Sequence, residues 1–122
     1  MTIEPIEDKK PADASLRVAP GICGFNCVVH IYRIDKRNVR VAIEGSECKQ
    51  IQRLSAALGG MSLKELFMPL TRNPVYAAAE KAGCHASCVL PAAILKATEA
   101  ALGMAIPRDV TFLFDPIERG DR

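Results

Sequence analysis

The thiol groups are the side chains of this chain whose type and spacing are best suited to chemistry. The 122-residue sequence contains five cysteines, which are Cys23, Cys27, Cys48, Cys84 and Cys88. An odd number of cysteines, without a recognisable secretion signal, argues against a disulfide framework. In a reducing compartment, clustered thiols more often bind a metal ion or take part in redox reactions. The pattern therefore favours a thiolate site over structural crosslinks.

Three of the thiols are expected where a loop meets a helix or strand. Cys23 lies in a glycine-rich loop before a predicted strand, and Cys48 and Cys88 lie at the beginnings of two predicted helices. The unpaired amides and positive partial charge of a helix N-terminus favour the thiolate, which is the form that binds metal. Soft thiolates select zinc or iron–sulfur clusters over hard cations. We therefore expect Cys23, Cys48 and Cys88 to converge on zinc or an iron–sulfur cluster.

The identity of a fourth ligand is left open by the sequence. Cys84 and His85 lie in the same short loop as Cys88, and Cys27 follows in the segment after the first thiol. The Cys-x-x-x-Cys spacing is less specific than the Cys-x-x-Cys of zinc ribbons. Each cysteine taken alone also suits the core, where Cys behaves as a small hydrophobic residue. His30 is expected on a face of the sheet, not as a ligand.

The segments that must position these residues begin with strands. Residues 28–34 are rich in β-branched and aromatic side chains, and residues 39–44 alternate apolar and polar positions, which predicts two strands. Residues 35–38 read as the turn that joins them into a hairpin. Residues 16–18 predict a short edge strand, and residues 110–114 predict a final strand.

Helical patterns dominate the second half of the chain. Capping residues and apolar positions at helical spacing predict four helices, over residues 46–58, 62–67, 74–81 and 90–102. Glycines are expected to end the first, third and last of them. This order predicts an α+β fold, with three or four helices packed on one face of a small antiparallel sheet of two to four strands.

Composition limits the classes of function. The length predicts one domain over residues 15–115, between a mobile tail at residues 1–14 and a second tail at residues 116–122. A net charge of +2 is too small to favour a nucleic-acid surface. No apolar run approaches the length of a membrane span, and we expect a cytoplasmic protein.

The chain resembles small cysteine-containing proteins of anaerobic bacteria and archaea that carry no assigned activity. The likeness spans about residues 18–114. It rests on Pro20-Gly21-Ile22-Cys23-Gly24-Phe25, on Cys48 ahead of a helix, and on His85-Ala86-Ser87-Cys88 leading into Pro91 and residues 94–97.

The order of the thiols also resembles, more loosely, the NifU/IscU-type iron–sulfur scaffold proteins. Cys23 followed by Gly before a strand, Cys48 opening a helix, and Cys88 near a His before the last helix match that family's order. The resemblance implies a small antiparallel sheet with helices on one face and a partner protein in metal or cluster transfer. Phe25 stands where the family has an Asp that helps keep a cluster transferable. A permanently held metal or cluster therefore fits this chain as well as a cluster carrier does.

Two further classes of function fit the residues. In a thiol enzyme or redox protein, a helix-terminal Cys would act with His85 as base, or Cys84 and Cys88 would cycle as a disulfide. In a non-catalytic interaction module, the alanine-rich last helix would form a homodimer, although its alanines suit intramolecular packing as well. No other catalytic motif stands out, so we expect a binding protein more than an enzyme.

Overall fold

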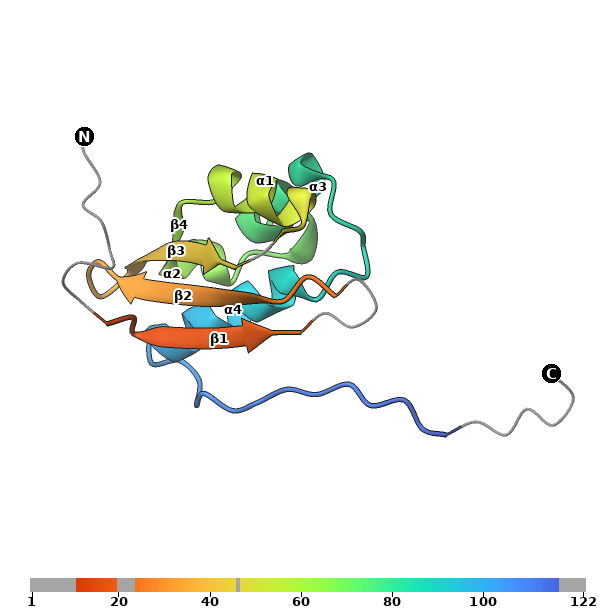
Figure 1. Ribbon diagram of the computed structural model, residues 1–122. Helices are drawn as coiled ribbons and strands as arrows, with labels where there is room; N and C mark the ends of the chain where they lie inside the picture. The colour runs from red at the N-terminus through yellow and green to blue at the C-terminus, as the bar shows by residue number, and fades with distance from the viewer. Residues whose placement is uncertain (1–10, 20–23, 46, 117–122) are drawn as a thin grey trace, which may run out of the picture.

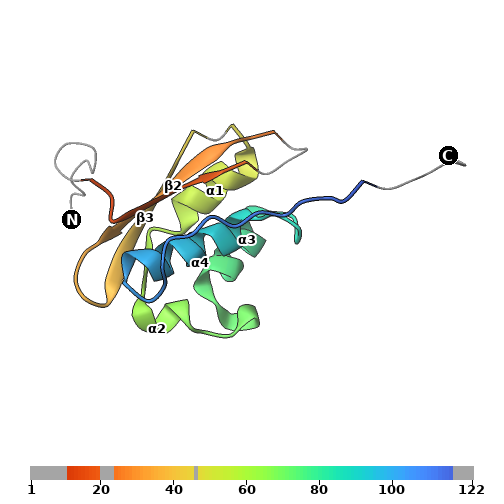
Figure 2. The same ribbon diagram turned by 90° about the horizontal axis from the view of Figure 1, so that it is seen from below.

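Helices cover one face of a four-stranded antiparallel sheet, which confirms the predicted α+β fold (Figures 1 and 2). The computed structural model describes residues 11–19, 24–45 and 47–116. The elements in chain order are β1 (Ala14–Val18), β2 (Cys27–Arg33), β3 (Asn38–Glu44), α1 (Lys49–Ala57), β4 (Gly60–Ser62), α2 (Leu63–Leu66), the 3₁₀ turn η3 (Leu70–Arg72), α3 (Pro74–Ala82) and α4 (Leu90–Ala101).

The strands follow sequence order in the sheet, from β1 at one edge to β4 at the other. Alternation of side chains gives the sheet two unlike faces. In β2 the side chains of Cys27, Val29 and Ile31 are buried beneath the helices, and the residues between them are only partly buried. The register pairs Val29 with Ile43 of β3, which places apolar positions of neighbouring strands on the same face.

The short strand β4 is not predicted from the sequence, because Gly59-Gly60 indicates only the end of the preceding helix. Gly60 pairs with Arg40 of β3. A Cβ atom at Gly60 would collide with the main-chain carbonyl oxygen of Val39. The glycine therefore permits a close approach between the two strands, besides ending a helix.

The helix boundaries follow the predicted caps. Ser62 and Glu65 form the expected capping box, in which the Ser62 amide donates to Glu65 Oε1 at 2.9 Å and the Glu65 amide donates to Ser62 Oγ at 3.2 Å. The buried side chain of Asn73 accepts a hydrogen bond from the Val75 amide and donates toward the carbonyl oxygens at the end of α2. Asn73 thus joins the beginning of α3 to the end of α2.

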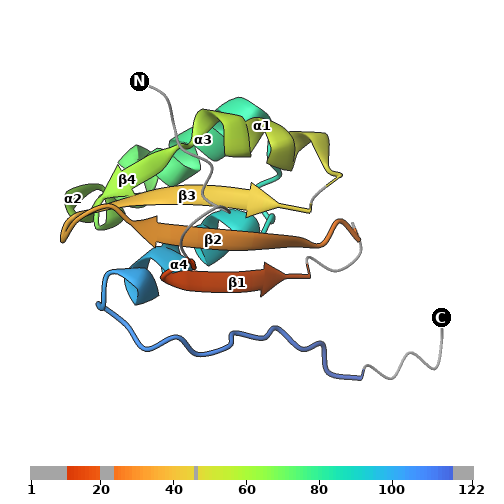
Figure 3. The same ribbon diagram turned by 60° about the vertical axis from the view of Figure 1, so that its left-hand side comes forward.

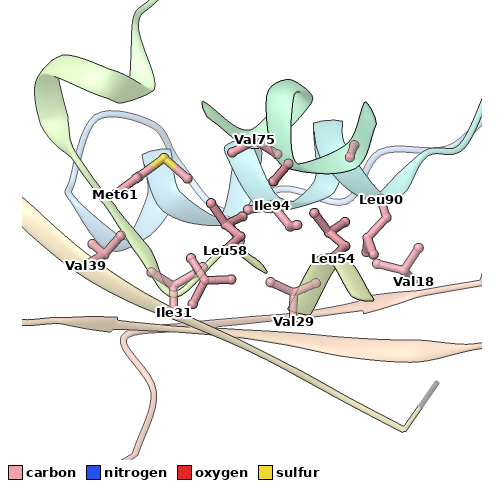
Figure 4. Close-up of a cluster of buried hydrophobic side chains, with 14 of the residues drawn as sticks. Val18, Val29, Ile31, Val39, Leu54, Leu58, Met61, Val75, Leu90 and Ile94 are labelled. Carbon is pink, nitrogen blue, oxygen red and sulfur yellow. The ribbon is translucent and has the colours of Figure 1, made fainter. Parts of the chain in front are cut away.

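The core lies between the sheet and helices α1, α3 and α4. Figure 4 shows Val29 and Ile31 of the sheet facing Leu54 of α1 and Ile94 of α4. These four side chains are fully buried, and Leu90 at the start of α4 is nearly so. Aliphatic side chains thus fill a core that contains no Trp.

The predicted final strand at residues 110–114 is wrong. After α4 the described chain runs extended through residue 116 without pairing as a strand (Figure 3). The strand-like pattern of this segment is present, but its side chains are exposed.

Among the described residues, no helix combines the length and the apolar character needed to cross a membrane.

Candidate thiol site

Cys48, Cys84 and Cys88 lie at one end of the molecule, although they come from different parts of the chain. Cys48 immediately precedes α1, while Cys84 and Cys88 lie in the loop between α3 and α4. Figure 3 shows the beginning of α1 and this loop at the same end of the sheet. All three side chains are partly buried against the core.

The position of Cys84 is fixed by the way in which α3 ends. Gly83 adopts the left-handed conformation, with φ of 80°. Its amide donates to the Glu80 carbonyl oxygen at 3.1 Å, and the Cys84 amide donates to the Ala79 carbonyl oxygen at 3.0 Å. These two bonds form a Schellman motif, which turns the chain sharply after the helix. Cys84 therefore occupies a defined position directly behind the C-terminus of α3.

A second local turn positions Cys88. Its amide donates to the carbonyl oxygen of His85 at 3.0 Å. Cys88 is followed by Val89, the N-cap of α4, and by Leu90, whose buried side chain anchors the start of the helix. The turn thus brings Cys88 back toward the core, and His85 remains exposed on the loop.

Cys48 is the N-cap residue of α1, but its side chain does not cap the helix amides. Its thiol instead donates a hydrogen bond to Gln50 Oε1 at 3.1 Å. Cys48 is therefore held at the N-terminal end of α1 by a contact with the first turn of the same helix.

Cys84 is close enough to Cys48 and Cys88 for both thiols to affect its ionisation. Burial raises the pKa of the Cys84 thiol, and thiolate charge at Cys88 and at Cys48 raises it further. A hydrogen bond with the Cys88 side chain acts in the same direction, whereas the positive charge of Arg53 opposes the shift. Cys84, one of the candidates for a fourth ligand, thus lies within the electrostatic reach of both other thiols.

Arg53 was not identified from the sequence. Its Nε donates a hydrogen bond to the Ala82 carbonyl oxygen at 3.0 Å, which links α1 to the last turn of α3. This cation fits the negative end of the α3 dipole. No local pattern could have indicated the contact, because the two residues are 29 positions apart in the chain.

The predicted ligands are only partly assembled. Cys23 lies outside the described residues, and Cys27 is buried in the core, where 5% of its surface is exposed. Across residues 11–19, 24–45 and 47–116, no group of three or more His, Cys, Asp or Glu side chains is arranged to hold a metal ion. The four cysteines that the structure describes, Cys27, Cys48, Cys84 and Cys88, form no disulfides. The structure thus brings three thiols close together, but their side chains are not arranged to coordinate one metal ion.

A hollow lies beside α1, the helix that follows Cys48, but no cysteine lines it. It measures about 180 Å³ and lies between β3 and α1, lined by Ile43, Gly45, Ile51, Gln52 and Ser55. Small-molecule pockets usually enclose about 300 to 1,000 Å³. The hollow is therefore too small to indicate a substrate site.

A second polar group lies on the face of the sheet away from the helices. His30 Nδ1 lies 2.7 Å from Ser15 Oγ, and His30 Nε2 lies 3.3 Å from Glu44 Oε1. The residue types match a hydrolytic triad, but Glu44 is 64% exposed and the three side chains come from three neighbouring strands of the sheet. His30 thus lies on a sheet face, and the group reads as cross-strand polar pairing.

The sequence matches DUF6951, a family of unknown function, over residues 14–114. The chain belongs to DUF6951. No curated protein and no solved structure matches it. The resemblance of this DUF6951 member to iron–sulfur scaffold proteins therefore stays a prediction. The matched range contains all five cysteines.

Proposed function

We propose that this protein binds a soft metal ion, zinc or the iron of an iron–sulfur cluster, through the thiolates of Cys48, Cys84 and Cys88. One observation carries the proposal, which is that thiolate charge at Cys48 and Cys88 raises the pKa of Cys84. Thiols from two separate segments, the start of α1 and the loop between α3 and α4, therefore lie close to one another. The donor set fits a soft cation, because thiolates prefer zinc and iron.

A bound cation would reverse the electrostatics of the cluster. Without it, each additional thiolate opposes ionisation of Cys84, whereas a metal ion favours the deprotonated form of all three thiols. Metal binding should therefore release protons and strengthen as pH rises. Cys23 or His85 would complete the ligand set, and the three described thiols would need to turn toward the ion.

The proposed role is storage, delivery or electron transfer in the cytoplasm, with another protein as donor or acceptor of the metal or cluster. Zinc would supply a structural crosslink, and an iron–sulfur cluster would supply one-electron chemistry. Neither role requires a substrate pocket, which agrees with the small volume of the hollow beside α1. A bound ion would also tie α1 to the loop between α3 and α4.

Elemental analysis and an absorption spectrum of protein purified without oxygen test the proposal. We expect about one equivalent of zinc, or iron and sulfide in cluster proportions. Titration of metal-free protein with Co²⁺ should give intense thiolate-to-cobalt absorption. Cys48→Ser, Cys84→Ser and Cys88→Ser should each weaken binding by more than about 100-fold, since loss of a residue that only hydrogen-bonds to a metal ligand already weakens binding 10- to 100-fold.

Cys27→Ser provides the matched control, because its thiol lies in the core. It should leave metal affinity within about twofold of the starting protein if the variant is folded. Cys23→Ser tests the remaining ligand. Metal-free protein with no Co²⁺ absorption, or equal loss of affinity in all five serine variants, would contradict the proposal.

A second candidate function is thiol–disulfide exchange by Cys84 and Cys88, favoured by their position in one short loop and by the electrostatic effect of Cys88 on Cys84. The pair would give up two protons and two electrons to a disulfide substrate, which would be reduced to two thiols while a Cys84–Cys88 disulfide forms. Equilibration with glutathione buffers, followed by mass spectrometry of alkylated peptides, tests this function. The proposal requires one disulfide between these two residues, and independent oxidation of several thiols would exclude it.

A further inference from the structure

The segment that follows α4 exposes an unusual number of large apolar side chains. Of the ten such exposed side chains in the described residues, six belong to this segment, namely Met104, Ile106, Val110, Phe112, Leu113 and Phe114. Phe112 is 79% exposed, Leu113 is 84% exposed and Phe114 is 98% exposed. A concentration of exposed large apolar side chains in one segment is typical of an interaction site in a folded protein.

The segment has the length and composition of a strand, although it pairs with no strand in the described structure. Residues 110–114 (Val-Thr-Phe-Leu-Phe) are β-branched or aromatic at four of five positions. In an extended chain, Val110, Phe112 and Phe114 lie on one side and Leu113 on the other. A strand with apolar residues on both sides needs cover on both faces. We call residues 110–114 the apolar arm.

The sheet offers an edge for such a strand. β1 is the terminal strand of the sheet and pairs with β2 alone among the described elements. Its five residues equal the apolar arm in length. Figures 1 and 3 show the segment after α4 running along the side of the molecule where β1 forms the edge. Unpaired edges of this kind readily accept a strand from another chain.

The difference between the two faces of the sheet indicates whether the arm pairs with β1 of its own chain or with β1 of a second copy. At β1 the helix-facing side is covered by α4, whereas the opposite side carries Ser15 and Arg17, which are exposed. An arm added to the edge of its own sheet would leave either Leu113 or the two phenylalanines on that uncovered side. In an exchange, the molecule that donates the arm also lies beside the sheet of its partner, so its surface can cover the side that the partner's helices leave open.

We propose that the apolar arm of one molecule adds as a strand to the outer edge of β1 in a second copy, and that the second copy reciprocates. The exchange is symmetric, so one two-fold axis pairs both edges and buries both arms. The family match begins at Ala14, the first residue of β1, and ends at Phe114, the last residue of the arm, so both halves of the contact belong to the region typical of DUF6951. This inference is independent of the proposed metal site.

Light scattering coupled to size-exclusion chromatography of the full-length protein tests the proposal. We expect a species of twice the 13.2 kDa chain mass. The double substitution Phe112→Asp with Leu113→Asp should shift it to a monomer, with at least a 100-fold weaker dimer, while circular dichroism confirms that the fold is kept. Phe67→Asp is the matched control, because Phe67 is 59% exposed at the end of α2 and should leave the dimer intact.

Hydrogen exchange read by mass spectrometry separates this dimer from other arrangements. The amides of residues 110–114 and of β1 should be protected in the wild-type protein and lose protection together in the arm variant. A protein that is monomeric at all concentrations overturns the proposal, whether or not its arm is protected. A dimer that survives the arm substitutions, as a contact through α4 would, overturns it as well.

Discussion

Cys27 and Cys84 have the same thiol group in contrasting environments. Cys27 begins β2 and is buried against the helices, paired in register with Val18 at the end of β1. Cys84 lies in a loop, is only partly buried, and senses the charges of two other thiols and an arginine. Burial by apolar neighbours makes a thiol inert, whereas proximity to other ionisable groups makes its protonation matter.

The contrast comes from backbone context, since both residues belong to Cys-x-x-x-Cys pairs. In β2 the alternation of the strand directs Cys27 to the same face as Val29 and Ile31. Cys84 and Cys88 instead lie in the loop that joins two helices. Equal spacing therefore does not imply equal function, and the first pair should not be counted as a ligand pair on its spacing alone.

Replacing Cys27 should produce the largest change in stability. Cys27→Ser replaces a buried thiol with a smaller and more strongly hydrated hydroxyl, and we expect a loss of about 1–3 kcal/mol in the free energy of unfolding. Cys84→Ser in the partly exposed loop should change the same quantity by less than about 0.5 kcal/mol. Urea unfolding of the metal-free variants, followed by circular dichroism in the presence of a reductant, measures both. Equal losses in the two variants would mean that the thiols are not in different environments.

Most of the fold could be predicted because it depends on local patterns. The alternation in residues 39–44 gave β3, the capping box of Ser62 and Glu65 gave α2, and Pro74 with Gly83 bounded α3. β4 could not be predicted, because its three residues have no periodicity and are held by pairing with β3. The apolar arm is the opposite case, because its sequence has a clear strand pattern but it pairs with no strand in the described chain.

The candidate site was harder to predict than the fold. The positions of Cys48 and Cys88 beside helix starts followed from helix patterns, and the structure agrees with them. The nearness of Cys84 to Cys48 depends on how α1 packs against α3, which no local signal contains. For the same reason Arg53 was missed, because its contact with Ala82 exists only after the two helices pack.

A smaller loss of stability should follow from changing the turn that places Cys84. Gly83→Ala puts a side chain at a φ of 80°, which costs about 1–2 kcal/mol in the left-handed region. Gly103→Ala is the matched control, since Gly103 has a φ of 76° and ends α4 with the same pair of backbone hydrogen bonds. Both variants should lose similar stability in urea unfolding.

Metal affinity should distinguish the two glycine variants. Only Gly83→Ala displaces Cys84, so only this variant should weaken Co²⁺ binding, by about 10-fold or more, as loss of a supporting contact does. If Gly103→Ala weakened binding as much, the effect would reflect general destabilisation. If neither did, Cys84 would not need its defined position to bind metal.

The smallest effect should be the pH dependence that Cys84 gives to the metal-free protein. Because its pKa is raised in the folded state, the folded protein keeps the Cys84 proton at a pH where the unfolded chain has lost it. The contribution of Cys84 should therefore be constant below the ordinary thiol pKa of about 8.5, and stability should fall as pH rises through the raised value. Urea midpoints measured between pH 7 and 10 should show this fall, and Cys84→Ser should reduce it.

The positive charge of Arg53 allows a second test of the same pKa shift. Arg53 lowers the pKa of Cys84 against the other causes, so Arg53→Gln should raise that pKa further and steepen the loss of stability at high pH. The rate at which iodoacetamide modifies Cys84, followed by mass spectrometry as a function of pH, reports the same shift directly. Cys27 in the same samples serves as the internal reference, and its modification should not respond to the Arg53 substitution. A change at both residues would show that the substitution opens the whole fold, and the distinction between the buried thiol and the clustered thiols would then fail.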